Sequence, residues 1–162
     1  MQRHRVVVNV EVAVVRDGQY LATVRGSGEG YGAGWLGFPG GKVNPDPAVP
    51  NVLEETARRE VLEEVGLDID DPIVYVESHT FAIGDDVVLD VVMLARSMSG
   101  EPYAASPDEV ASVEWLTYEA IRRWRLPDAA VDAGLTQSRG AKAARGRVVV
   151  GVGREGRLIG RG

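Results

Sequence analysis

The sequence has no cysteine among its 162 residues, few aromatic residues (6%) and no long apolar run. The lack of cysteine excludes disulfides, thiolate metal sites and a cysteine nucleophile, and leaves the redox compartment open. No segment reaches the roughly 18 consecutive apolar residues typical of a membrane helix. The N-terminal Arg3-His4-Arg5 leads into a valine-rich stretch rather than a signal-like apolar segment. We therefore expect no membrane partner and, by default, a cytoplasmic protein.

Charge is unevenly distributed along the chain. The whole sequence carries a net charge of −6, whereas residues 138–162 contain seven Lys or Arg and one Glu, a net of +6, so that residues 1–137 carry −12. An acidic body that handles polyanionic phosphates needs metal cations to neutralise both sides. The basic residues lack interleaved aromatic residues, which argues against specific nucleic-acid binding.

Two regions are predicted from this composition. Hydrophobic residues make up 44% of the chain, enough to bury one core, and we assign residues 1–137 to a single compact domain. Residues 138–162 are a basic, Gly/Arg-rich C-terminal tail, in which residues 147–152 and 157–159 could form a small hairpin. We expect this tail to be dispensable for the chemistry.

Alternating apolar patterns predict several strands around one long helix. Residues 5–15 and 20–25 flank Asp17-Gly18 and indicate a β-hairpin. Further strands are expected near 73–81, 87–96 and 113–116, with short helices at 118–123 and from about 128. The glycine-rich loop at 26–34 is interpreted as flexible rather than as a nucleotide loop, because no helix follows it. The pattern predicts an α/β fold, an α/β/α sandwich with a mixed sheet.

The most informative segment is the acidic run from Arg59 to Leu67. On a helix, Glu60, Glu63 and Glu64 fall within an arc of roughly 100°. Carboxylates crowded in this way repel one another unless a cation lies between them. Hard oxygen ligands suit Mg²⁺ or Mn²⁺, so the segment predicts a divalent-metal site.

Together with the upstream Gly40-Gly41-Lys42, this segment resembles the signature of the Nudix hydrolases: Gly, five residues, Glu, seven residues, then Arg-Glu-apolar-any-Glu-Glu-any-Gly-apolar. The second half matches without a gap. In the first half, Asn51 stands where the family has Glu, and nine residues rather than five separate it from Gly41. We interpret Asn51 as the helix N-cap, with Glu54 completing a capping-box-like start.

An ordinary amphipathic helix is the alternative interpretation. Leu53, Ala57, Val61 and Val65 repeat every four residues as a core stripe, and Gly66 is a common helix-ending residue. The stripe and a metal-binding face are compatible, since they occupy different sides of the helix.

The resemblance implies a metal-dependent hydrolase of phosphoanhydride bonds, with the α/β/α sandwich as its fold. It implies Glu63 and Glu64 as principal Mg²⁺ or Mn²⁺ ligands and Glu60 as a further ligand or the water-activating base. Arg59 is expected to orient these carboxylates by salt bridges. Glu109, in a loop before the strand at 113–116, is the favoured separate general base, with His79 a weaker candidate.

The substrate is less well defined by the sequence. Residues 32–43 and 124–128 resemble stretches of oxidised-purine nucleoside triphosphatases in the Nudix family, although the match around Asp128 is partial. Asp128 would then read a base edge through hydrogen bonds, or simply cap the next helix. The expected substrate-binding residues are Arg25, Phe38, Gly40, Gly41, Lys42 and Asp128.

Three functions remain open from the sequence. The first is a pyrophosphohydrolase of nucleoside (deoxy)triphosphates, including oxidised purine nucleotides, that uses water attack at phosphorus. The second is a hydrolase of ADP-ribose, a dinucleotide or a nucleotide sugar. The third is a non-catalytic nucleotide-sensing Nudix module, which the retention of all three glutamates disfavours. The residues give no oligomeric state, while the resemblance is compatible with a homodimer.

Overall fold

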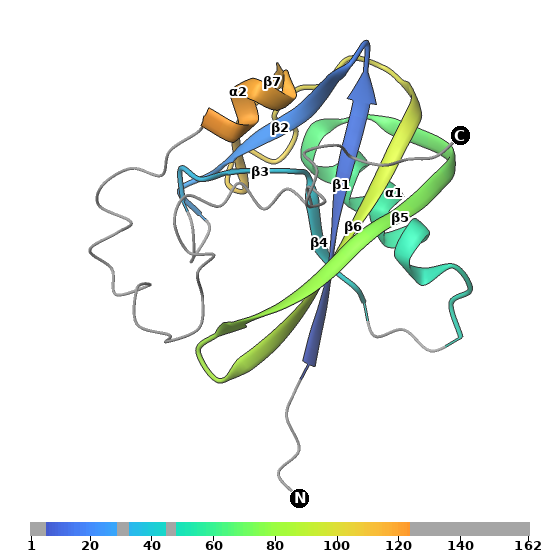
Figure 1. Cartoon of the computed structure of the whole chain (residues 1–162), viewed down its shortest axis with the longest axis vertical. Helices are drawn as coiled ribbons and strands as arrows, with labels where there is room; N and C mark the ends of the chain where they lie inside the picture. The colour runs from blue at the N-terminus through green and yellow to red at the C-terminus, as the bar shows by residue number, and fades with distance from the viewer. Residues whose placement is uncertain (1–5, 29–32, 45–47, 124–162) are drawn as a thin grey trace, which may run out of the picture.

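The computed structural model describes residues 6–28, 33–44 and 48–123 of the chain. Within these ranges, a mixed sheet runs through the molecule with one long helix packed against it (Figure 1). The predicted α/β class is confirmed. The division at residue 137 stays a prediction, because residues 124–162, including the expected tail and the helix near 128, lie outside the described residues.

The strands form one connected set whose main path runs β3-β2-β1-β6-β5. Strand β1 lies beside β6 in parallel, and the hairpins β1–β2 and β5–β6 are antiparallel. Strand β4 pairs with β1, and β7 pairs with β2. The strands are β1 (Val6–Arg16), β2 (Gln19–Arg25), β3 (Leu36–Gly37), β4 (Gly40–Lys42), β5 (Asp68–Ile83), β6 (Asp86–Ser99) and β7 (Val110–Leu116).

The two faces of β1 belong to two separate cores. Val10, Val12 and Val14 face the helix α1 (Val52–Val65), and alternate residues Ala13 and Val15 face the opposite side. Such alternation follows from the two-residue period of a strand that is covered on both faces. On the far side, Ile121 of the short helix α2 (Tyr118–Arg123) joins the second core. The sheet therefore has helical residues on each face.

Helix α1 buries the stripe that its sequence predicts. Ala57, Val61 and Val65 are fully buried against the sheet, and Leu53 packs at the edge of this core. The helix ends at Gly66, which adopts a left-handed φ of 70° and donates its N–H to the carbonyl of Leu62.

The expected capping box is wrong. Asn51 is the residue before the helix, but its side chain makes no capping hydrogen bond. It adopts a left-handed conformation (φ 51°, ψ 42°), rather than the extended one in which an N-cap side chain turns back onto the first helical N–H groups. Its carbonyl still accepts the first helical hydrogen bond from Glu55. The chain therefore enters the helix through a left-handed residue.

The strands after the helix are longer than predicted. Strands β5 and β6 form a hairpin of 16 and 14 residues that extends well past α1 (Figure 1).

Among the described helices, none has the length and apolar character needed to span a membrane.

Candidate active site

Glu60 and Glu64 lie one turn apart on α1 and contact the short strand β4. The N–H of Gly40 donates to Glu64 Oε2 at 3.1 Å, and Gly41 packs directly against the carboxylate of Glu60. A Cβ added at Gly41 would collide with that carboxylate. The glycine pair therefore allows the backbone of β4 to approach the two acids closely.

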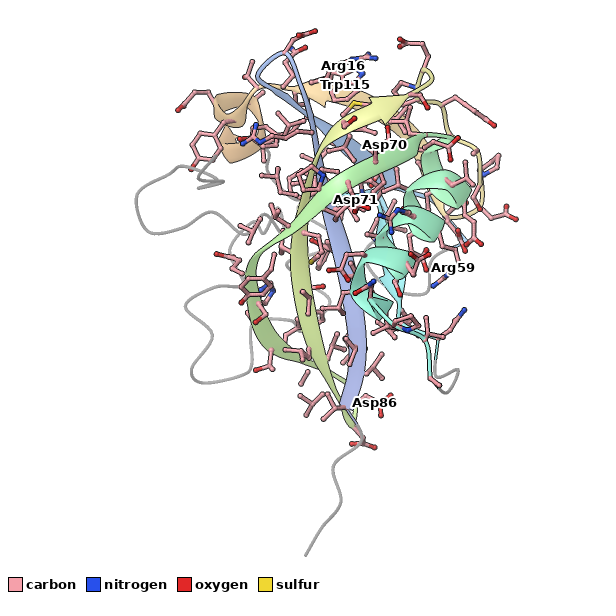
Figure 2. The ribbon with its side chains drawn as sticks, turned by 90° about the vertical axis from the view of Figure 1, so that its right-hand side faces the viewer. Arg16, Arg59, Asp70, Asp71, Asp86 and Trp115 are labelled. Atoms are coloured by element: carbon pink, nitrogen blue, oxygen red, sulfur yellow. The ribbon has the colours of Figure 1, made fainter. Side chains whose placement is uncertain are left out.

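Arg59 connects the acidic face of α1 to β4 (Figure 2). Its Nη1 lies 2.7 Å from Glu60 Oε1 and 3.3 Å from Glu63 Oε2. Its Nη2 donates to the carbonyl oxygen of Lys42 at 2.9 Å. One guanidinium thus orients two carboxylates and the end of β4, which is the geometry expected of a positioning residue.

Burial changes the proton affinity of the carboxyl groups of Glu60 and Glu64. Burial raises the pKa of Glu60, and the charges of Glu63 and Glu109 raise it further, while Arg59 lowers it. For Glu64, burial raises the pKa to about 8, from an ordinary value of 4.5. The Gly40 hydrogen bond and Arg25 oppose this shift, and Glu60 and Glu109 add to it. Four glutamates therefore influence one another at this point of the molecule.

The raised pKa of Glu64 predicts a pH-dependent stability of the metal-free protein. Because the folded state holds this proton more tightly than the unfolded chain, the free energy of unfolding should fall as pH rises from about 4.5 to about 8. We expect a loss of at most a few kcal/mol over this range. Urea unfolding in chelator at pH 5.5 and pH 8 measures it, and Glu64→Gln should flatten the dependence. An unchanged slope in that variant would assign the effect to other groups.

Glu109 reaches this site from a loop far along the chain. The N–H of Gly26 donates to the carbonyl of Glu109 at 2.6 Å, and that of Gly28 to the carbonyl of Asp108 at 3.0 Å. A Cβ at Gly26 would overlap the Asp108 carbonyl. The described part of the glycine-rich loop, expected to be simply flexible, thus holds the Glu109 loop. Sequence reasoning missed this pairing, which no local pattern reveals.

The three carboxylates predicted to share one metal face are not clustered. The side chain of Glu63 is 57% exposed and forms an ion pair with Arg59, whereas the carboxylate of Glu64 accepts a hydrogen bond from the N–H of Gly40. In the part of the chain that the structure describes, no three Asp, Glu or His side chains lie close enough together to hold a metal ion. The donor set nevertheless fits a divalent cation, because hard carboxylate oxygens that raise one another's pKa bind such a charge favourably.

The other residues expected at the site differ in their location and in their exposure to solvent. Arg25 ends β2 and acts electrostatically on Glu64, and Lys42 is exposed at the end of β4. Phe38, expected to contact substrate, is only 5% exposed and packs beside Tyr20, so its observed role is in the core. Asp128 lies outside the described residues. His79 lies on β5 with its Nε2 3.6 Å from buried Asp90 Oδ2, as a structural histidine would.

Comparisons with known proteins agree on one family. The sequence model of the family described as the NUDIX domain matches residues 4–138 of this chain. A search of curated proteins found no match. Among solved structures, the MutT NUDIX hydrolase from Burkholderia pseudomallei is 28% identical, with a TM-score of 0.65 over 79% of this chain and 95% of that one.

Two further structures share the fold at lower identity. The MutT protein from Methanosarcina mazei Go1 is 24% identical, with a TM-score of 0.66 over 79% of this chain and 89% of that one. The NUDIX domain of NrtR from Shewanella oneidensis, complexed with ADP ribose, is 16% identical, with a TM-score of 0.58 over 81% and 84% of the two chains.

Proposed function

Because this chain belongs to the Nudix family and is a Nudix hydrolase of phosphoanhydride bonds, we propose that its substrates are nucleoside (deoxy)triphosphates, oxidised purine nucleotides among them. The observation that carries the proposal is the pair of buried Glu60 and half-buried Glu64 against the glycines of β4, with Glu109 within electrostatic range of both. The resemblance of residues 32–43 to stretches of oxidised-purine nucleoside triphosphatases supports the triphosphate class.

The proposed site divides the work among residues of three segments. Glu63 and Glu64 are the principal ligands of a divalent cation, with Glu60 as a further ligand or the water-activating base. When bound, Mg²⁺ or Mn²⁺ neutralises the phosphates and makes a coordinated water more acidic. Arg59 fixes the orientation of the carboxylates through its ion pairs with Glu60 and Glu63.

The remaining residues act on the substrate and its proton. Arg25 and Lys42 are proposed to contact phosphate oxygens. Gly40 and Gly41 have no side chains and so leave room for the phosphates to approach. Glu109 accepts the proton of the attacking water. Its loop is held by a hydrogen bond from Gly26, and its charge acts on both Glu60 and Glu64. Asp128 is proposed to read the edge of the base.

Replacing Glu109 should slow the chemical step. In Glu109→Gln, we expect kcat to fall by about 100-fold, because a positioned general base contributes this much or more. KM should change little, because the loss lies in the chemical step and not in substrate binding. Asp108→Asn is the matched control, since the hydrogen bond from Gly28 goes to the backbone carbonyl of Asp108. Equal loss in both variants would show that the loop has only a structural role.

A panel of nucleotides tests the substrate class. It includes ordinary and oxidised purine triphosphates, ADP-ribose, a dinucleotide and a nucleotide sugar, each assayed with Mg²⁺ and Mn²⁺ for released phosphate and pyrophosphate. We expect the highest kcat/KM on a triphosphate, with pyrophosphate released. A preference for ADP-ribose would favour the second candidate, which the shared fold with an ADP-ribose-bound domain supports.

The same panel tests the proposed role of Asp128. In Asp128→Ala, the ratio of kcat/KM between bases should change by about 10-fold or more, because a lost paired hydrogen bond affects one base more than another. Overall turnover on the best substrate should change less. A uniform loss across all bases would indicate a structural role instead.

A further inference from the structure

The outer edge of β5 has no partner strand in the described residues. Strand β5 pairs with β6 on one side and ends the main path of the sheet. Its register shifts between Asp70 and Ile73 and between Tyr75 and Glu77, but from Glu77 to Ile83 it is continuous. Alternate N–H and C=O groups along such an edge can accept another strand.

The regular part of this edge, residues 77–83, contains no proline and no bulge, two features that commonly prevent strand addition. Edge strands are commonly blunted by lysines, and the β5–β6 hairpin contains no lysine. Residues 68–99 contain seven Asp or Glu and one Arg, a net of −6. Apolar side chains are exposed on the same strand, namely Val74 (39%), Tyr75 (59%) and Ile83 (40%). Asp70, Asp71 and Asp86 mark the two ends of this acidic hairpin in Figure 2.

Charge distinguishes the possible occupants of the edge. Two copies of β5 facing each other would bring two hairpins of −6 together, which like-charge repulsion disfavours. The C-terminal tail has the opposite sign, because residues 138–162 carry +6. The tail also contains β-branched residues: Val148, Val149, Val150 and Val152.

The tail also has the reach to arrive at this edge. The NUDIX match ends at residue 138, so residues 139–162 lie beyond it. The 23 residues between Arg123 and Arg147 span up to about 80 Å when extended, more than enough to cross the domain. Residues 147–153 number seven, as do residues 77–83.

We infer that residues 147–153 dock on the outer edge of β5, beside residues 77–83, as an added strand of the same chain. Backbone hydrogen bonds provide the pairing, and the tail arginines face the acids of the hairpin. This covers the exposed edge with a segment of complementary charge. The proposal does not depend on the substrate or on turnover.

The absence of cysteine gives a clean cross-linking test in the full-length chain. Thr80→Cys, at an exposed position in the regular part of β5, is combined in turn with Val148→Cys, Val150→Cys and Val152→Cys. The matched control is Glu114→Cys, an exposed position on β7, combined with the same tail positions. Disulfide formation under mild oxidation is followed on non-reducing gels.

We expect at least one tail position to cross-link with Thr80→Cys at least 10-fold faster than with Glu114→Cys, within a single chain. Salt at 1 M, or Arg147→Glu with Arg154→Glu, should slow it several-fold, because both weaken the attraction between the tail and the hairpin. Equal rates with Glu114→Cys would overturn the proposal. Cross-links that join two chains would also overturn it, since the tail would then dock on another copy.

Discussion

Glu64→Gln should remove about 99% or more of metal-dependent hydrolysis and, at the same time, stabilise the metal-free protein at pH 8. The loss follows because the amide is neutral and binds a divalent cation poorly. The gain follows because Gln needs no proton to stay uncharged in a site where burial raises the pKa of Glu64 to about 8. Hydrolysis at limiting Mg²⁺ and urea unfolding in chelator measure the two effects.

The controls separate metal binding from folding. Glu63→Gln should also lower hydrolysis strongly, but without the gain in stability, since Glu63 is largely exposed. Glu54→Gln makes the same chemical change in the first turn of α1 and should leave both quantities near those of the unaltered protein. Near-normal turnover of both Glu63→Gln and Glu64→Gln at limiting Mg²⁺ would contradict the assigned metal ligands.

Gly41→Ala should reduce turnover by about 100-fold or more while the protein stays folded. The new methyl group would overlap the carboxylate of Glu60, which can move because it is the end of a flexible side chain. Its displacement disturbs the ion pair with Arg59 and moves the acid away from β4. Activity, thermal unfolding and the circular dichroism spectrum of the purified variant test this.

Two neighbouring glycines provide matched comparisons for the same substitution. At Gly40, a Cβ would meet the backbone of Val10 and Glu11 instead of a side chain, so Gly40→Ala should lower stability as well as activity. At Gly37, nothing lies within 4 Å, and Gly37→Ala should be close to neutral. If Gly41→Ala behaved like Gly37→Ala, close contact between β4 and Glu60 would not matter for catalysis.

The long helix and its neighbours could be read from the sequence because their signals are local. The four-residue repeat of Leu53, Ala57, Val61 and Val65 matches the buried stripe, and Asp17-Gly18 marks the observed hairpin. These features arise from helix period and turn geometry, which nearby residues set on their own. Strand ends were less accurate, since β5 and β6 extend through cross-strand pairing that local composition does not encode.

The entry into α1 shows where local rules fail. Asn51 and Glu54 have the spacing of a capping box, yet the chain arrives at Asn51 in a left-handed conformation and the side-chain bond is not made. Ala48, three residues earlier, also has a positive φ of 63°. A favourable local motif is therefore overridden by the direction from which the chain enters.

The sequence by itself determined the family, the α/β fold and the acidic helix, because the spacing of Glu60, Glu63 and Glu64 after a glycine pair is a property of neighbouring residues. Only the tertiary structure decided how these acids are used. It buries Glu60 and half-buries Glu64 against β4, and it leaves Glu63 exposed beside Arg59. It also brings Glu109 into electrostatic range through hydrogen bonds from Gly26 and Gly28 to the Glu109 loop. Burial and contacts between distant segments set these environments, and such contacts exist only once the chain has folded.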